Sequence, residues 1–207
     1  MYKIGILTDK PNIQHAFILA KRTVLPVIIV FMEIREAYKF CPRCGSGFEN
    51  KPEFLKCTSC GLSFYHNPKP TTTVVLVDKD NRYLLVKRAV DPAKGYWDFP
   101  GGFVEENETS EENAWREIKE ELGLDNLGKF HYVGSVTAPY LYQDIIYPTL
   151  ATVFVTLIPP GARPRAADDI ASFKFFKPEE IPMDKIAFPE LKKVLGLVNK
   201  FLETHKL

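Results

Sequence analysis

The chain has 207 residues, a formal net charge of +1 and 45% hydrophobic residues, which suits one globular domain with a small appendage. The nearly balanced charge leaves no strong electrostatic attraction for nucleic acid or for an acidic membrane surface. All four cysteines lie within residues 41 to 60. This clustering is unlike a disulfide-stabilised secreted domain and indicates a metal site in a reducing compartment, the cytoplasm.

Residues 1–38 form an N-terminal extension whose status the sequence leaves open. Two apolar runs, 16–20 and 24–31, are interrupted by Lys21, Arg22 and Pro26, so neither is long enough to cross a membrane. No small-residue cleavage site follows them, as a signal peptide would require. A charged stretch begins at Met32, and we expect a chain starting there to be soluble and active. The alternative is that residues 1–31 add a short strand or helix to the fold.

Residues 39–66 contain an internal repeat with metal-ligand spacing. Each half reads Cys-x-x-Cys-Gly-x-x-Phe, and the halves supply Cys41, Cys44, Cys57 and Cys60. Four thiolates at this spacing predict a structural Zn²⁺ site, a zinc ribbon, and so short a segment needs the metal to fold. Iron is the main competitor, and a dithiol redox pair is less favoured because no βαβ pattern surrounds the cysteines.

The ribbon is not expected to bind nucleic acid. Its basic residues are few and are offset by Glu49 and Glu53, so packing on a catalytic domain is the favoured role. His66 follows the last cysteine, but four thiolates already complete a zinc site. We therefore expect His66 to be a surface or packing residue.

The domain expected over residues 67–207 begins with strand patterns. Residues 67–70 form a linker, 71–77 and 83–88 are β-branched and apolar, and the turn residues 78–82 between them predict a hairpin. Residues 96–100 then lead into a Pro-Gly-Gly loop. Trp97 in that segment either packs in the core or forms a wall of a site beside the loop.

A capped helix is predicted to follow the loop. Thr109 is a good N-cap, Glu112 completes a capping box, and Gly123 suits a left-handed C-cap. At about 100° per residue, one stripe of this helix is apolar and should face the core: Ala114, Trp115, Ile118 and Leu122.

An adjoining stripe of the same helix carries Glu117, Glu120 and Glu121. Like charges at this spacing repel, and they lie near the negative end of the helix dipole. A bound Mg²⁺ or Mn²⁺, shared with substrate phosphates, would make both effects favourable. A solvated acidic surface is the alternative that the stripe alone leaves open.

The rest of the chain reads as two strands, 131–141 and 145–158, a loop at 159–164, a strand at 172–176 and an amphipathic helix at 189–202. The tyrosines between the first two strands are stacking candidates for a substrate base, with core or dimer contacts as the alternative: Tyr140, Tyr142 and Tyr147. Asp168 and Asp169 either supply a base or metal ligand, or are ordinary loop residues, which we favour.

The stretch from Gly102 to Leu124 reads Gly-x5-Glu-x7-Arg-Glu-Ile-x-Glu-Glu-x-Gly-Leu, and with this complete pattern the chain resembles the Nudix hydrolases over about residues 71–205. The resemblance implies an α/β/α sandwich with a mixed sheet, preceded here by the four-cysteine zinc ribbon. It also implies Mg²⁺-dependent hydrolysis of a nucleoside diphosphate linked to another group. The metal-binding groups would be Glu117, Glu120 and Glu121 with a carbonyl near Gly101, while Arg116 orients the glutamates and Gly102 and Glu108 support the loop. Glu117 and Glu120 are the box candidates for the base.

The ribbon resembles that of two Nudix groups. The NADH pyrophosphatases carry a Ser-Gln-Pro-Trp-Pro-Phe element that is missing here, whereas residues 65–69 and 181–188 resemble the ADP-ribose and FAD pyrophosphatases. We therefore expect an ADP-ribose or FAD type of substrate, with NADH, NAD-capped RNA or nucleoside triphosphates as alternatives. A ligand-sensing or nucleic-acid-binding module is the non-enzyme alternative. Expected partners are the nucleotide and, as an open option, a second copy in a homodimer, but no membrane.

Overall fold

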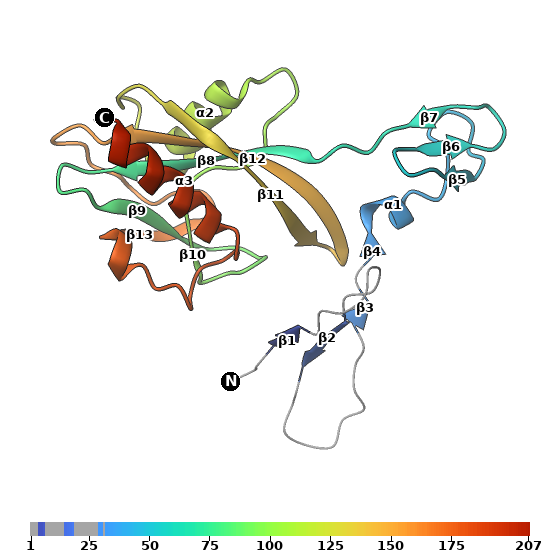
Figure 1. The fold of residues 1–207 in the computed structure, drawn as a ribbon, viewed down its shortest axis with the longest axis horizontal. Coiled ribbons are helices and arrows are strands. Elements are labelled where there is room, and N and C mark those ends of the chain that lie inside the picture. The colour runs from blue at the N-terminus through green and yellow to red at the C-terminus, as the bar shows by residue number, and fades with distance from the viewer. Residues whose placement is uncertain (1–3, 7–14, 19–28, 31) are drawn as a thin grey trace. The chain divides into compact units, whose positions relative to one another are not determined.

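The computed structural model describes residues 4–6, 15–18, 29–30 and 32–207. These residues form two compact units (Figure 1). The first comprises residues 1–67 and 139–148, and the second comprises residues 68–138 and 149–207. The expectation that residues 1–31 are dispensable falls mostly outside the described residues. Three short strands described there, β1 (Ile4–Ile6), β2 (His15–Ile18) and β3 (Ile29–Val30), pair with one another.

The second unit is built on a mixed sheet in the order β10-β9-β8-β12-β11, with β13 pairing with the other side of β9. Its strands are β8 (Lys69–Val77), β9 (Tyr83–Arg88), β10 (Trp97–Asp98), β11 (His131–Tyr142), β12 (Ile145–Leu157) and β13 (Ile170–Phe176). β12 runs parallel to β8 over nine paired residues. The hairpin predicted for β8 and β9 is confirmed, although the two strands pair only beside their turn, at Leu76–Leu84 and Val77–Tyr83.

Two helices cover opposite faces of this sheet. Because successive residues of a strand point to opposite sides, neighbouring residues of β8 contact different helices. Val74 and Leu76 of β8 pack with Ile118 and other residues of α2 (Ser110–Leu122). Val75 and Val77 pack with residues of α3 (Leu191–Thr204) on the other face. A short 3₁₀ helix, η1 (Pro178–Glu180), follows β13. The predicted α/β/α sandwich with a mixed sheet is confirmed (Figure 1).

The ends of α2 are as predicted. Thr109 accepts a hydrogen bond from the Glu112 backbone amide in a capping box, and Gly123 is left-handed with φ of 63°. The predicted core stripe is wrong at Trp115, which remains 37% exposed and packs on Phe130, with ring centroids 4.6 Å apart. Asn113, which was not predicted to face the core, is fully buried. Its burial is possible because the side-chain amide of Asn113 has hydrogen-bond partners beneath the helix.

The first unit holds the ribbon, an antiparallel sheet of β5 (Phe48–Asn50), β6 (Leu55–Cys57) and β7 (Ser63–Phe64). The segment before it forms β4 (Met32–Glu33) and α1 (Ile34–Ala37). β4 pairs with the first residues of β12 at the tip of the β11–β12 hairpin, which belongs to the same unit. Within the described residues, no helix is long and apolar enough to span a membrane.

Candidate active site

Two glycines bring the loop before α2 against the sheet. The backbone amide of Thr72 donates to Gly102 O and that of Val74 to Pro100 O, both at 2.9 Å. Gly101 has φ of 134°, and a Cβ there would overlap the carbonyl of Thr72. A Cβ on Gly102 would overlap the carboxylate of Glu117. Gly101 is therefore required for the loop to pack on β8, whereas a side chain at Gly102 would displace the Glu117 carboxylate.

Arg116 joins the loop to the acidic stripe. Its Nε donates to Glu108 Oε1 at 2.8 Å, and its Nη1 donates to both Glu117 Oε1 and Glu120 Oε2 at 2.9 Å. Its Nη2 reaches Glu108 Oε2 and the carbonyl of Phe103. The bonds from Arg116 lower the pKa of Glu108 to about 2, so this carboxylate stays ionised. Two carboxylates of the stripe, Glu117 and Glu120, are therefore held by one guanidinium.

Asn113 is a residue that the sequence analysis missed. Its Nδ2 donates to Phe103 O at 2.7 Å and to Glu108 Oε2 at 3.0 Å, and its Oδ1 accepts from the hydroxyl of Thr72. A fully buried asparagine with three partners is strongly constrained, because leaving any of these groups unpaired would cost about 1–3 kcal/mol. The only signal in the sequence is an amide on the buried side of a predicted helix.

Glu121 is the most buried carboxylate of the stripe, with 4% of its surface exposed. Its Oε2 accepts from the Gly101 amide at 3.1 Å. Burial raises its pKa to about 9, and the charges of Asp169 and Glu117 add to the rise. Burial also raises the pKa of Glu117. Oxygen donors that are buried and mutually repulsive in this way suit a hard cation.

Asp169 lies close enough to the stripe to raise the pKa of both Glu117 and Glu121. Two backbone bonds fix its loop: Ala89 N donates to Asp169 O at 2.7 Å, and Ala167 N donates to Glu121 O at 3.0 Å. The sequence analysis favoured an ordinary loop role for this residue. Its placement makes Asp169 a fourth carboxylate beside the site, whereas Asp168 is marked only by a positive φ of 51°.

A charged pair supports the strand that leads into the loop. Arg88 Nη1 and Asp98 Oδ2 are 3.6 Å apart, and both side chains are about 15% exposed. Arg88 Nε also donates to Pro92 O at 2.7 Å. Burial raises the pKa of Asp98 to about 7, against the opposing effect of Arg88.

The predicted substrate-binding aromatics lie in different places. Trp97 packs against the core on the α3 face, with its ring 5.1 Å from that of Phe176. Tyr140 and Tyr142 stack with centroids 6.4 Å apart, and Tyr147 is partly buried. All three tyrosines belong to the hairpin tip of the first unit. Their contact with a substrate base stays a prediction.

The four cysteines of the ribbon lie together, with all their sulfur atoms within 4.8 Å of one another. Cys41 and Cys60 Sγ are 3.7 Å apart, and Cys44 and Cys57 Sγ are 3.5 Å apart. A tetrahedral site with Zn–S bonds of about 2.3 Å places its sulfurs about 3.8 Å apart. The geometry therefore fits zinc. The backbone amide of Ser46 contributes most to lowering the pKa of Cys44 to about 6, whereas burial and the neighbouring sulfurs raise that of Cys60 to about 11, so the sulfur distances carry the assignment.

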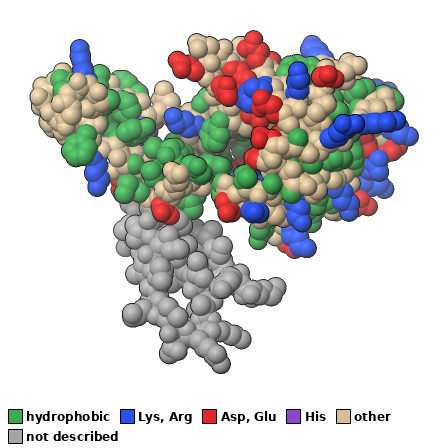
Figure 2. All heavy atoms as spheres, turned by 180° about the vertical axis from the view of Figure 1, so that it is seen from behind, with side chains coloured by type: hydrophobic (Ala, Val, Ile, Leu, Met, Phe, Trp, Pro, Cys, Tyr) green, Lys and Arg blue, Asp and Glu red, His purple; other side chains and the backbone are tan. Residues whose placement is uncertain are grey.

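The glutamates are not gathered in this way. Among the described residues, the cysteines are the one group of three or more metal-ligating side chains brought so close together. Looser spacing suits Mg²⁺, which keeps several waters and shares its remaining positions with phosphates. Figure 2 shows acidic side chains gathered on the second unit, with basic side chains among them.

His66 is outside the cysteine group. Its Nε2 accepts from Arg35 Nε at 2.8 Å, and the same guanidinium donates to the carbonyls of Lys51 and Pro52. The expected packing role suits these contacts.

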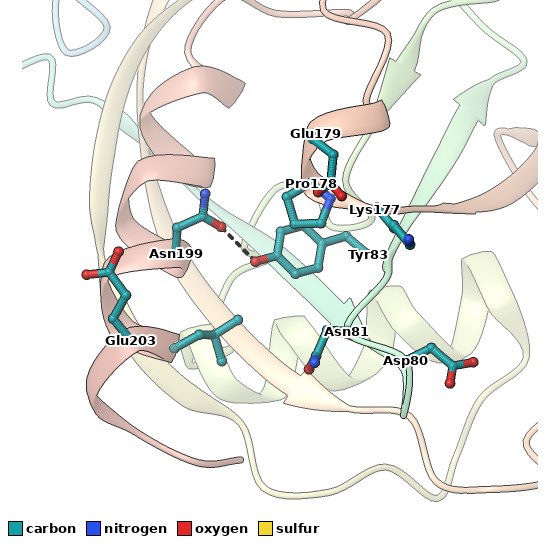
Figure 3. A pocket seen from close by; sticks show the side chains of 9 residues that line it. Asp80, Asn81, Tyr83, Lys177, Pro178, Glu179, Asn199 and Glu203 are labelled. Atoms are coloured by element: carbon teal, nitrogen blue, oxygen red, sulfur yellow. Dashed lines mark hydrogen bonds between the residues drawn. The ribbon is translucent and has the colours of Figure 1, made fainter.

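A cavity of about 570 Å³ lies elsewhere in the second unit (Figure 3). Its walls come from the β8–β9 turn, η1 and α3, and Tyr83 donates to Asn199 Oδ1 across its floor at 2.7 Å. The cavity lies beside the β8–β9 turn, beyond the last residue of β8. The glycine loop instead contacts Thr72 and Val74, which lie earlier in β8. The cavity is therefore separate from the carboxylate site.

Comparison with known proteins relates the chain to a family and to individual relatives. The family model for the NUDIX domain matches residues 67–196. An ADP-ribose pyrophosphatase of Methanocaldococcus jannaschii is 39% identical over 117 residues, which cover 56% of this chain and 66% of that protein. A NAD-capped RNA hydrolase, NudC, of Pseudomonas aeruginosa is 31% identical over 104 residues, which cover 49% of this chain and 36% of that protein. The chain spans less than two thirds of the length of either relative.

Solved structures also resemble the fold. The crystal structure of a NUDIX hydrolase from Nitrosomonas europaea matches with a TM-score of 0.54 and 27% identity. The match covers 80% of this chain and 90% of that one.

Proposed function

Because the chain belongs to the NUDIX family, we propose that it hydrolyses the pyrophosphate bond of a nucleoside diphosphate linked to another group, with ADP-ribose or FAD as the first candidates. The observation that carries this proposal is the bonding of Arg116 to Glu108, Glu117 and Glu120. It keeps all the box carboxylates in place beside buried Glu121. The similarity to an ADP-ribose pyrophosphatase supports the choice of substrate.

In the proposed reaction, water attacks one phosphorus of the anhydride, the bridging P–O bond breaks, and two phosphate monoesters form. Mg²⁺ bound by Glu117, Glu120 and Glu121 would neutralise phosphate oxygens and lower the pKa of the water. Arg116 fixes the directions of Glu117 and Glu120, and the Gly101 amide fixes that of Glu121.

A carboxylate must accept the proton of the attacking water. Glu117 and Glu120 are the candidates from the box, and Asp169 is the candidate that the structure adds. Glu117→Gln, Glu120→Gln and Asp169→Asn together separate these roles, because only the variant that lacks the base should lose the acidic limb of the pH profile of kcat.

The substrate is tested by a turnover screen with Mg²⁺ over ADP-ribose, FAD, NADH, diadenosine polyphosphates and nucleoside triphosphates. We expect ADP-ribose or FAD to have the highest kcat/KM. No turnover of any of these substrates would overturn the proposal. The similarity to NudC favours NAD-capped RNA as a second candidate, and a highest kcat/KM for NADH would select it.

The ribbon metal is proposed to be zinc with a structural role. The sulfur positions fit a tetrahedral site, and a sheet of three strands of two or three residues has too little core to be stable alone. The zinc would stabilise the ribbon and take no part in hydrolysis.

A further inference from the structure

Two side-chain hydroxyls join the sheet of the second unit to the first half of α2. Thr72 of β8 and Thr152 of β12 are direct partners in the parallel pairing of these strands. The Thr72 hydroxyl donates to Asn113 Oδ1, and the Thr152 hydroxyl lies 3.3 Å from that of Ser110. The two contacts are alike in chemistry and position. Among the described residues, only the first of them continues by hydrogen bonds into the carboxylate site.

The side chains of Asn113 and Arg116 share two acceptors. Asn113 Nδ2 donates to Phe103 O at 2.7 Å and to Glu108 Oε2 at 3.0 Å. Arg116 Nη2 donates to the same two atoms, at 3.2 Å and 3.1 Å. The other terminal nitrogen of Arg116 donates to two carboxylates of the stripe. The position of the amide is therefore linked, through these shared acceptors, to the direction in which the guanidinium points.

The Thr72 hydroxyl keeps the amide of Asn113 in place, because it is the donor that the structure gives to Asn113 Oδ1. Asn113 is fully buried, so water cannot replace that donor, and an unpaired buried acceptor is unfavourable. Without the hydroxyl, the amide would turn or shift toward another donor. Its bonds to Phe103 O and Glu108 would change with it, and these are the acceptors that Arg116 also uses. A hydroxyl on the sheet therefore controls the geometry of a guanidinium on the helix.

We infer that Thr72 and Asn113 are positioning residues for the metal that the acidic stripe would bind. They act through Arg116, which fixes the directions of Glu117 and Glu120. Residues that orient the ligands of a metal set much of its affinity. The identification of the stripe as a metal site rests on the proposed function, whereas the hydrogen-bond chain from the sheet to the carboxylates does not depend on it.

The test measures Mn²⁺ binding to the full, zinc-containing chain without substrate. Mn²⁺ takes the same oxygen ligands as Mg²⁺, and its free ion gives an electron paramagnetic resonance signal that is lost on binding. Thr72→Val keeps the shape of the side chain and removes the hydroxyl, whereas Thr72→Ser keeps the hydroxyl. Thr152→Val is the matched control, because it makes the same change at the paired position of the neighbouring strand.

We expect Thr72→Val to raise the Kd for Mn²⁺ by about tenfold, the lower end of the effect of losing a residue that orients metal ligands. Thr72→Ser and Thr152→Val should stay within about twofold of wild type, because neither breaks the chain to Arg116. Asn113→Ala should raise Kd by about tenfold or more, because both ends of the amide are lost. Circular dichroism shows whether each variant is folded, and Asn113→Ala decides the matter if Thr72→Val is not.

The inference is overturned if folded Thr72→Val binds Mn²⁺ as tightly as Thr152→Val does, or if the wild type binds no Mn²⁺. Hydrolysis is measured separately, and the Mg²⁺ concentration that gives half of the maximal rate should rise in Thr72→Val and stay unchanged in Thr152→Val. Absence of hydrolysis in every protein would refute the proposed function, while a weaker Mn²⁺ affinity of Thr72→Val would still support the positioning role.

Discussion

Replacing Glu121 with glutamine should make the metal-free protein more stable while making it inactive. Glu121 is 4% exposed and its pKa is raised to about 9, chiefly by burial. At pH 7 the unfolded carboxyl, with an ordinary pKa of 4.5, is ionised, so folding must protonate it. At about 1.4 kcal/mol per pH unit, this costs about 3 kcal/mol. Glutamine has no such cost and can keep the hydrogen bond from Gly101.

The sign of the pH dependence follows from the same pKa values. Between pH 4.5 and about 9 the folded protein binds a proton on Glu121 that the unfolded chain does not. Wild-type stability should therefore fall as pH rises through this window, relative to Glu121→Gln. The free energy of unfolding of Glu121→Gln should equal that of the wild type near pH 4.5. At pH 7 it should be larger by about 1–3 kcal/mol, after allowing for relaxation around the buried group.

Urea unfolding in Mg²⁺-free buffer, without a chelator that would remove zinc, measures this difference. The matched control is Glu120→Gln, whose side chain is 48% exposed and pairs with Arg116. Its stability should stay within about 0.5 kcal/mol of wild type. Added Mg²⁺ should stabilise the wild type more than Glu121→Gln. A variant that is equally stable or less stable than wild type from pH 7 to 9 would refute the electrostatic reasoning.

Three further changes test other parts of the site. Glu117→Gln should lower kcat by about 100-fold or more while the protein stays folded, and turnover near wild type would remove Glu117 from the metal site. In Gly102→Ala the new methyl group displaces the Glu117 carboxylate, so kcat should fall with an unchanged circular dichroism spectrum. Elemental analysis should find one zinc per chain, and Cys44→Ser should lose it while keeping part of the hydrolytic activity. Stoichiometric iron would contradict the zinc assignment.

The sequence predicted those parts of the fold that depend on local pattern. The ends of α2 follow from Thr109, Glu112 and Gly123, whereas the sandwich was expected from the resemblance to the Nudix hydrolases. Which side of α2 is buried was harder to predict, because the acidic and apolar stripes adjoin. Trp115 was placed too deep and Asn113 was missed, since one partner of Asn113 is Thr72, 41 residues earlier in the sequence.

Electrostatics in the site also depends on contacts that no local pattern shows. The pKa of Glu121 depends on Asp169, which reaches the site from the loop before β13. Nothing in the spacing of residues 117–121 indicates a charged neighbour 48 positions later. The tyrosines of the β11–β12 hairpin tip were predicted to contact substrate because they lie where two strands after the box join, whereas the structure groups them with the ribbon unit.

The contacts of Arg116 favour the metal-site interpretation of the acidic stripe over a solvated surface. On a solvated surface a single i,i+4 pair would be expected, contributing about 0.3–0.5 kcal/mol. Instead, Arg116 bonds with Glu108 in the loop and with both Glu117 and Glu120 on the helix, and its side chain is only 25% exposed. Asn113 ties Glu108 and the Phe103 carbonyl to the same helix. Loop and helix thus form one hydrogen-bonded body, so a carboxylate on the helix keeps a fixed direction relative to the glycine loop. Fixed carboxylates that repel one another raise the energy of the metal-free protein, and a bound Mg²⁺ would relieve that repulsion while leaving positions open to phosphate oxygens.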